Sequence, residues 1–229
     1  MWWFQRKPSP LHRFIQVVLI GLTPMVLLLN SINLVASDPW LNFEYNRLSF
    51  PRDSFGYSVK DRVRISQRVL AFVESRDGLA SLSGEYGGVD SSFDNREILH
   101  LEDVRSVFKL VSSLYTIIWI CWGVLAWSLA VENETRRLLS KGLIAGGVWT
   151  LTLTMISVLF VTVTWDWMFV RFHQLLFIPG TWQFAIDSNL IRLFPETFWV
   201  DSATAVLLLT ALQSVGLSMI PVVTRNVRN

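Results

Sequence analysis

Four long runs of apolar residues follow one another along the chain, and each is long enough to cross a lipid bilayer as a helix. The first run covers residues 14–36 and contains no charged side chain. Residues 110–131, 142–165 and 203–223 also contain no charged side chain. A helix needs about 20 mainly apolar residues to cross the hydrocarbon core of a bilayer. The pattern therefore predicts an all-α polytopic membrane protein with four transmembrane helices.

Basic residues gather in the short segments that flank these runs, and short loops rich in Lys and Arg stay in the cytoplasm. With four spans, both termini and the loop after the second span lie on one side, which we expect to be cytoplasmic. These segments carry Arg6, Lys7, Arg13, Arg136, Arg137, Lys141, Arg225 and Arg228. Tryptophans gather on the opposite side, as is typical of a membrane interface. They are Trp40, Trp165, Trp167, Trp182 and Trp199.

The order of segments follows from the four spans and this orientation. A cleaved signal peptide would also begin with basic residues, but the first apolar run is long for that role, so we expect an uncleaved first span. The predicted segments are a cytoplasmic N-terminus (1–13), a first span (14–36), an extracytoplasmic domain (37–105), a second span (106–131), a cytoplasmic loop (132–141), a third span (142–165), an extracytoplasmic interfacial segment (166–202), a fourth span (203–223) and a cytoplasmic tail (224–229).

Composition agrees with a membrane protein and narrows its partners. The chain is 52% hydrophobic and 17% charged, whereas soluble domains carry about 25% charged residues. The net charge of +2 gives no reason to expect a nucleic-acid partner. The one cysteine, Cys121, lies inside a predicted span and has no second cysteine with which to form a disulfide.

The two predicted outer segments read as mostly helical. Ser58 is a typical N-cap for a helix that begins at Val59, and a glycine-rich stretch (76–92) is expected to be a loop. Asp94 or Asn95 then caps a helix that continues into the second span. Residues 169–195 are too polar to cross the bilayer and too apolar to lie free in water, so we expect amphipathic pieces in the interface plane.

Histidines supply the candidate chemistry on this outer side. His100 lies on the helix that enters the second span, where Asp103 is spaced to hydrogen-bond its ring. His173 lies beside Arg171 in the interfacial segment. A structural reading, in which the charges simply belong to a solvated helix start, also fits. Ionisable groups close to lipid nonetheless favour a functional site.

Several other chemistries lack their motifs. The sequence has no H-E-x-x-H pair or cysteine cluster for a metal, no glycine loop with the lysine that a phosphate site needs, and no G-x-S-x-G elbow for a serine nucleophile. Acid–base catalysis by histidine on a substrate held in lipid remains.

Four stretches are similar to a known family. They are "FPRDSFGYSVKDRVRISQRVLAFV", "NREILHLEDVRSVF", "FHQLLFIPGTW" and "LIRLFPETFWVDSA". With the four-span plan they resemble the bacterial lipoprotein intramolecular transacylases, over nearly the whole chain. The resemblance implies a bacterial cell-membrane enzyme that moves the sn-2 acyl chain of a diacylglyceryl-cysteine lipoprotein onto the α-amine of that cysteine, giving a lyso-form lipoprotein.

The resemblance also implies that His100 and His173 are the catalytic pair, that membrane lipids and lipoproteins are the partners, and that no cofactor or metal is used. We expect His100, oriented by Asp103, to be the base and His173 the acid, although the sequence leaves their order open. Arg96, Arg105 and Arg171 are candidate donors to the oxyanion. The further candidate supporting residues are Tyr57, Arg62, Glu97 and Asp201.

Two other interpretations remain open at this stage. Another lipid acyltransferase or a hydrolase could use the same histidines. A non-catalytic scaffold would instead bind a partner through residues 37–105, and it would tolerate loss of both histidines. The oligomeric state and the identity of the lipoprotein substrates do not follow from the sequence.

Overall fold

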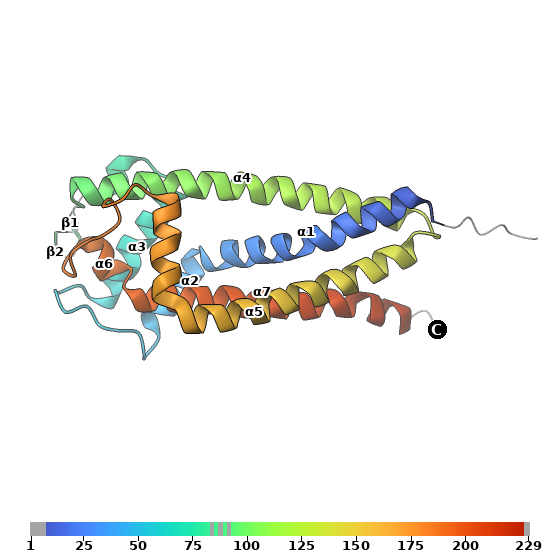
Figure 1. Cartoon of the computed structure of the whole chain (residues 1–229). Helices are drawn as coiled ribbons and strands as arrows, with labels where there is room; N and C mark the ends of the chain where they lie inside the picture. The colour runs from blue at the N-terminus through green and yellow to red at the C-terminus, as the bar shows by residue number, and fades with distance from the viewer. Residues whose placement is uncertain (1–7, 83–84, 87–88, 91–92, 227–229) are drawn as a thin grey trace, which may run out of the picture. The chain divides into compact units, whose positions relative to one another are not determined.

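Four long helices carry the apolar runs in a computed structural model that describes residues 8–82, 85–86, 89–90 and 93–226 (Figure 1). In this part of the chain they are α1 (Pro10–Val35), α4 (Asn95–Val131), α5 (Arg136–Leu176) and α7 (Glu196–Asn226). All four are long and apolar enough to cross a membrane. The predicted all-α fold with four apolar helices is therefore confirmed.

The chain divides into two compact units, and the four long helices run through both. The first unit comprises Met1–Ile32, Ser113–Phe160 and Val206–Asn229, and the second comprises Asn33–Ser112 and Val161–Ala205. The first unit thus holds most of the charge-free sequence, and the second holds nearly all of the two predicted outer segments.

Polar side chains join the helices of the first unit. Asn30 donates to Gln213 (2.6 Å), and Gln213 donates to Ser31 (2.7 Å). Thr210 also donates to Ser31 (2.9 Å), and Tyr115 donates to Asn30 (3.1 Å). Hydrogen bonds of this kind between helices stabilise packing in membranes, where lipid cannot satisfy a polar group.

Two adjacent glycines let α5 approach its neighbours in the first unit. A Cβ on Gly146 would lie 2.7 Å from Oγ1 of Thr23 on α1, and one on Gly147 would lie 2.7 Å from the carbonyl oxygen of Ser214 on α7. Small residues at such positions are typical of helix interfaces in membranes.

The second unit has a hydrophobic core built from short helices and the first turns of α4 and α7. Its short elements are α2 (Asp38–Asn46), α3 (Val59–Val73), the 3₁₀ helix η1 (Leu79–Leu82) and α6 (Asn189–Leu193). Strands β1 (Glu85–Tyr86) and β2 (Val89–Asp90) form a small antiparallel pair. The core includes Leu41, Tyr45, Ile65, Val69, Phe72, Leu101, Leu190, Leu193 and Phe198.

Capping residues define the first turns of α3 and α4, as the sequence predicted. Ser58 caps α3, and its side chain and that of Asp61 form a reciprocal capping box. Asp94 caps α4 in the same way: its Oδ1 accepts from the Glu97 N–H (2.8 Å), and Glu97 Oε2 accepts from the Asp94 N–H (2.9 Å). The stretch expected to be a loop contains η1, β1 and β2, while residues 83–84, 87–88 and 91–92 lie outside the described residues.

Helix α5 changes direction at Thr164, whose backbone is not helical (φ −127°, ψ 27°). The part of α5 beyond this residue carries the first piece of the predicted interfacial segment and ends at Leu176. An irregular stretch from Phe177 to Ser188 then leads to α6.

Candidate active site

His100 and His173 lie together in the second unit. His100 is in the second turn of α4, well before the charge-free run that begins at Leu110, and His173 is in the last turn of α5. Both therefore lie outside the segments expected to span the membrane. Their ring centroids are 6.4 Å apart and their planes differ by 21°. The structure brings together the two histidines that the sequence singled out.

Aromatic rings enclose this histidine pair. The His100 ring lies 4.8 Å from the Phe177 ring and 5.5 Å from the Phe184 ring. The His173 ring lies 4.1 Å from the Phe169 ring and 4.8 Å from the Trp182 ring. The enclosing rings come from the end of α5 and the irregular stretch that follows it.

Burial among these rings keeps both imidazoles neutral. Burial, with a smaller contribution from the neighbouring His173, lowers the pKa of His100 to about 4 against the opposing charge of Asp103. Burial also lowers the pKa of His173, against the opposing effect of a hydrogen bond to the Phe169 carbonyl. Neutral imidazoles can accept protons near neutral pH.

The two rings differ in their hydrogen bonds. His173 Nδ1 lies 2.8 Å from the Phe169 carbonyl oxygen. Because a carbonyl only accepts, Nδ1 carries the proton and Nε2 keeps its lone pair. His100 Nδ1, in contrast, is buried and has no hydrogen-bond partner among the described residues.

The predicted hydrogen bond between Asp103 and His100 is absent from the contacts of the described residues. The His100 ring packs against Phe177 and Phe184, which covers its Nδ1. Asp103 acts on His100 only through its charge. The described contacts therefore give no support to the expectation that Asp103 orients this ring.

Glu97 joins the histidine helix to α6. Its side chain is buried, and Oε1 accepts from the Leu190 N–H (2.9 Å), a residue 93 positions away. Burial raises the pKa of Glu97, although its backbone hydrogen bonds oppose the shift. Glu97 thus supports the site from one turn before His100.

The three arginines expected at the oxyanion are bound elsewhere in the described structure. Arg96 donates to the carbonyl oxygens of Gly180 (3.1 Å) and Gln183 (3.2 Å). Arg105 donates to Ser75 (3.0 Å). Arg171 donates to Gln174 (3.2 Å) and lies over the Trp167 ring (5.7 Å).

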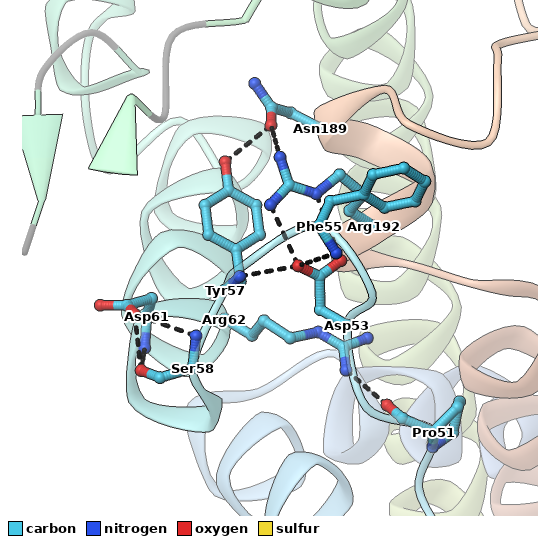
Figure 2. Close-up of polar contacts among 9 residues, drawn as sticks. All are labelled: Pro51, Asp53, Phe55, Tyr57, Ser58, Asp61, Arg62, Asn189 and Arg192. Carbon is cyan, nitrogen blue, oxygen red and sulfur yellow. Dashed lines mark hydrogen bonds and ion pairs between the residues drawn. The ribbon is translucent and has the colours of Figure 1, made fainter. Parts of the chain in front are cut away.

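Tyr57 belongs to a polar cluster that fastens α6 to the turn before α3 (Figure 2). Its hydroxyl donates to Asn189 (2.6 Å), and its N–H donates to Asp53 (2.7 Å). Arg192 donates to the same two side chains, at 3.2 Å to Asn189 and 3.0 Å to Asp53. Sequence reasoning did not single out Asp53 and Arg192, although both lie in the stretches that carry the family resemblance.

Arg62 and Asp201 also have packing partners away from the histidines. Arg62 is buried, donates to the Pro51 carbonyl (2.7 Å; Figure 2) and lies 5.0 Å from the Tyr45 ring centroid. Asp201 pairs with Arg47, which also donates to Glu44 (2.8 Å). These contacts join α2, α3 and the first turns of α7.

Apolar side chains border the histidine pair on the last turns of α5 and just beyond. Phe172 and Leu175 flank His173 in sequence, and both are exposed. Leu176 and Ile178 are exposed as well. This surface suits an acyl chain.

Among the described residues, no group of three or more His, Cys, Asp or Glu side chains could hold a metal ion.

Comparison with known proteins gives one consistent family. The model of the family "Lipoprotein intramolecular transacylase Lit" matches residues 17–199. A curated relative from Aquifex aeolicus, described as an uncharacterized protein, is 27% identical over 206 residues, covering 88% of this chain and 90% of its own.

Solved structures of the same family share the fold. The lipoprotein intramolecular transacylase Lit from Bacillus cereus superposes with a TM-score of 0.78 at 20% identity, over 95% of this chain and 98% of its own. A variant of that protein with one histidine replaced by alanine gives a TM-score of 0.73 at 18% identity, over 96% of each chain. Because the family model matches well over half of the chain, this integral membrane protein belongs to the lipoprotein intramolecular transacylase family and is an acyltransferase.

Proposed function

We propose that this protein moves the sn-2 acyl chain of a diacylglyceryl-cysteine lipoprotein onto the α-amine of the same cysteine, with His100 and His173 as the acid–base pair. The observation that carries the proposal is the pair of neutral imidazoles, 6.4 Å apart, in an aromatic enclosure beside exposed apolar side chains. Family membership supports the acyl transfer, and the pair supports the catalytic roles.

The proton balance of this reaction calls for two proton-transfer groups. The α-ammonium nitrogen loses two protons as it becomes an amide. One proton ends on the glyceryl oxygen when the ester C–O bond breaks, and the other leaves to water. The amine attacks the ester carbonyl directly, so no enzyme nucleophile is needed. Because both groups belong to one substrate, holding them in position supplies a large part of the rate.

The hydrogen bonds support His173 as the base. With Nδ1–H donated to Phe169, its Nε2 is the acceptor for a proton from the substrate nitrogen. His100 then relays the second proton from the nitrogen to the glyceryl oxygen. As an imidazolium of low pKa it is a strong donor for that step. This order reverses the one expected from the sequence, which relied on Asp103.

The outer leaflet is the proposed place of reaction. The basic short segments support cytoplasmic termini by the positive-inside rule, and four spans then support an extracytoplasmic histidine pair. Lipid-anchored substrates present their ester and amine at that surface. The exposed Leu175 and Ile178 beside the site would contact the acyl chains.

The test is mass spectrometry of the N-terminal lipopeptide of a reporter lipoprotein, in a host without this activity. The wild type is expected to move one acyl chain onto the amine, and His100→Ala and His173→Ala are expected not to. His12→Ala is the matched control, since the contacts of His12 among the described residues are with Ser9 and Glu132, away from the histidine pair in sequence.

Three outcomes would contradict the proposal. If diacylglyceryl-cysteine stays unchanged when the wild type is well expressed, the proposed reaction is wrong. Free fatty acid with an unmodified amine would indicate a hydrolase instead. Full activity in both histidine variants would agree with the proposed reaction but contradict the catalytic roles of His100 and His173.

A further inference from the structure

Acyl transfer places negative charge on the ester carbonyl oxygen while the C–N bond forms and before the C–O bond breaks. Hydrogen-bond donors aimed at that oxygen lower the barrier. The guanidinium groups of Arg96, Arg105 and Arg171 already donate to other acceptors. These bonds hold the three side chains against other acceptors, whereas the residues that enclose the histidines lie beside the proposed reacting groups.

Trp182 is the one ring of that enclosure with an N–H to give, and its N–H is unused. The ring centroid lies 4.8 Å from that of His173. Its Nε1 is buried and has no hydrogen-bond partner among the described residues. An indole nitrogen can only donate. A buried donor left unpaired costs about 1–3 kcal/mol, so it calls for a functional explanation.

Three other tryptophans show how an indole N–H is ordinarily satisfied in this protein. Trp40 donates to Ser202 (3.0 Å), Trp122 to Thr23 (3.0 Å) and Trp199 to the Phe194 carbonyl (3.1 Å). Trp182 differs from them both in its free N–H and in its position against His173.

The backbone on both sides of Trp182 is held in place. Arg96 donates to the carbonyl oxygens of Gly180 and Gln183, which bracket Trp182. Gly180 has φ +86°, a conformation that favours glycine. Arg96 comes from the helix that carries His100, so one element positions both the indole and the imidazole.

We propose, on the basis of the function proposed above, that the indole N–H of Trp182 donates to the carbonyl oxygen of the acyl ester. As the amine adds, the C–N bond forms and the carbonyl π electrons move onto oxygen. As the glyceryl oxygen leaves, they return and the carbonyl is restored in the amide. Trp182 donates a hydrogen bond throughout and transfers no proton.

The sharpest test replaces the indole of Trp182 with benzothiophene, an isosteric ring whose sulfur removes the N–H, by site-specific incorporation of 3-benzothienylalanine. Activity is measured with a synthetic diacylglyceryl-cysteine lipopeptide in detergent. We expect kcat to fall by about 10²- to 10³-fold, the range for removing one oxyanion donor, with KM within threefold of wild type. Thermal stability should be unchanged or higher, because the lost N–H has no partner among the described residues.

Trp199, whose N–H donates to a backbone carbonyl, is the matched control. The same replacement there should lower thermal stability and leave kcat nearly unchanged. Trp182→Phe provides a second variant that also lacks the N–H.

A full rate in the benzothiophene variant of Trp182 would overturn the inference, and so would a loss of stability that matches the loss of rate. Neither result would affect the proposed function, which fails only if the wild type does not transfer the acyl chain.

Discussion

At the scale of single residues, the two histidines have different environments despite their parallel rings. His173 is fixed by the Phe169 carbonyl, whereas Nδ1 of His100 faces no partner among the described residues. Sequence spacing suggested a carboxylate for His100 and none for His173. The tertiary packing of Phe177 and Phe184 on His100 decided otherwise, since it turns the ring into the aromatic enclosure.

The pH profile should report this burial. The neutral imidazole is the active form, and a lowered pKa keeps it neutral to lower pH than the ordinary value of about 6.5. Since burial lowers the pKa of His100 to about 4, kcat/KM should show no inflection near pH 6.5. It should instead be level through pH 6.5 and fall as the substrate ammonium, with a pKa of about 8, loses to solvent the proton that His173 is proposed to remove.

The measurement is kcat/KM for a synthetic lipopeptide between pH 5 and pH 9. A clear inflection near pH 6.5 would mean that the histidines titrate as exposed ones do. The neutral aromatic enclosure would then be the wrong description of the active protein.

At the scale of elements, an ion pair and buried hydrogen bonds connect α6 to neighbouring segments of the second unit. Asp53 and Arg192 lie 139 positions apart, and their side chains are nearly inaccessible. Burial alone would raise the pKa of Asp53, but hydrogen bonds from Arg192 and from the Tyr57 N–H outweigh it and the pKa is lowered. Glu97 makes a second bridge, from α4 to α6.

Asp53→Ala should lower the free energy of unfolding by about 3 kcal/mol, since it leaves the guanidinium of Arg192 without its carboxylate. Thermal unfolding in detergent measures the loss. Asp61→Ala is the control, because Asp61 is largely outside the core and contributes a helix cap of about 1 kcal/mol. Equal losses in the two variants would contradict this view of the bridge.

The ion pair of Asp53 and Arg192 also predicts how stability changes at acid pH. A carboxyl whose folded-state pKa is lowered stabilises above its unfolded value, about 3.9, and loses that contribution as pH falls through the folded value. As the pH falls below about 4, the free energy of unfolding should therefore decrease more for the wild type than for Asp53→Ala.

At the scale of the whole molecule, the four long helices serve two different units. In the first unit, close packing through Gly146 and Gly147 and the polar network around Ser31 join the helices. In the second, the first turns of α4 and α7 contribute Leu101 and Phe198 to a hydrophobic core. A helix such as α4 thus carries an apolar run in one unit and His100 in the other.

The glycine packing gives a matched pair of substitutions. Gly147→Ala should destabilise the protein by about 1–3 kcal/mol, because its Cβ would lie 2.7 Å from the backbone oxygen of Ser214. Gly216→Ala has open space at its Cβ and should be neutral or stabilising by up to about 1 kcal/mol. Thermal unfolding of the purified proteins measures the two effects. A Gly147→Ala variant as stable as the wild type would contradict the close contact between α5 and α7 at this position.

The sequence by itself determined the features that depend on local or one-dimensional physics. The spans follow from uncharged runs of bilayer length, and the caps of α3 and α4 follow from residues three positions apart. The histidine pair followed from motifs shared with a family. Only the tertiary structure decided which side chains meet across long separations: Asp53 with Arg192, and Trp182 with His173. Such contacts depend on how distant segments pack, and packing also left Asp103 unpaired with His100 and the Trp182 N–H free.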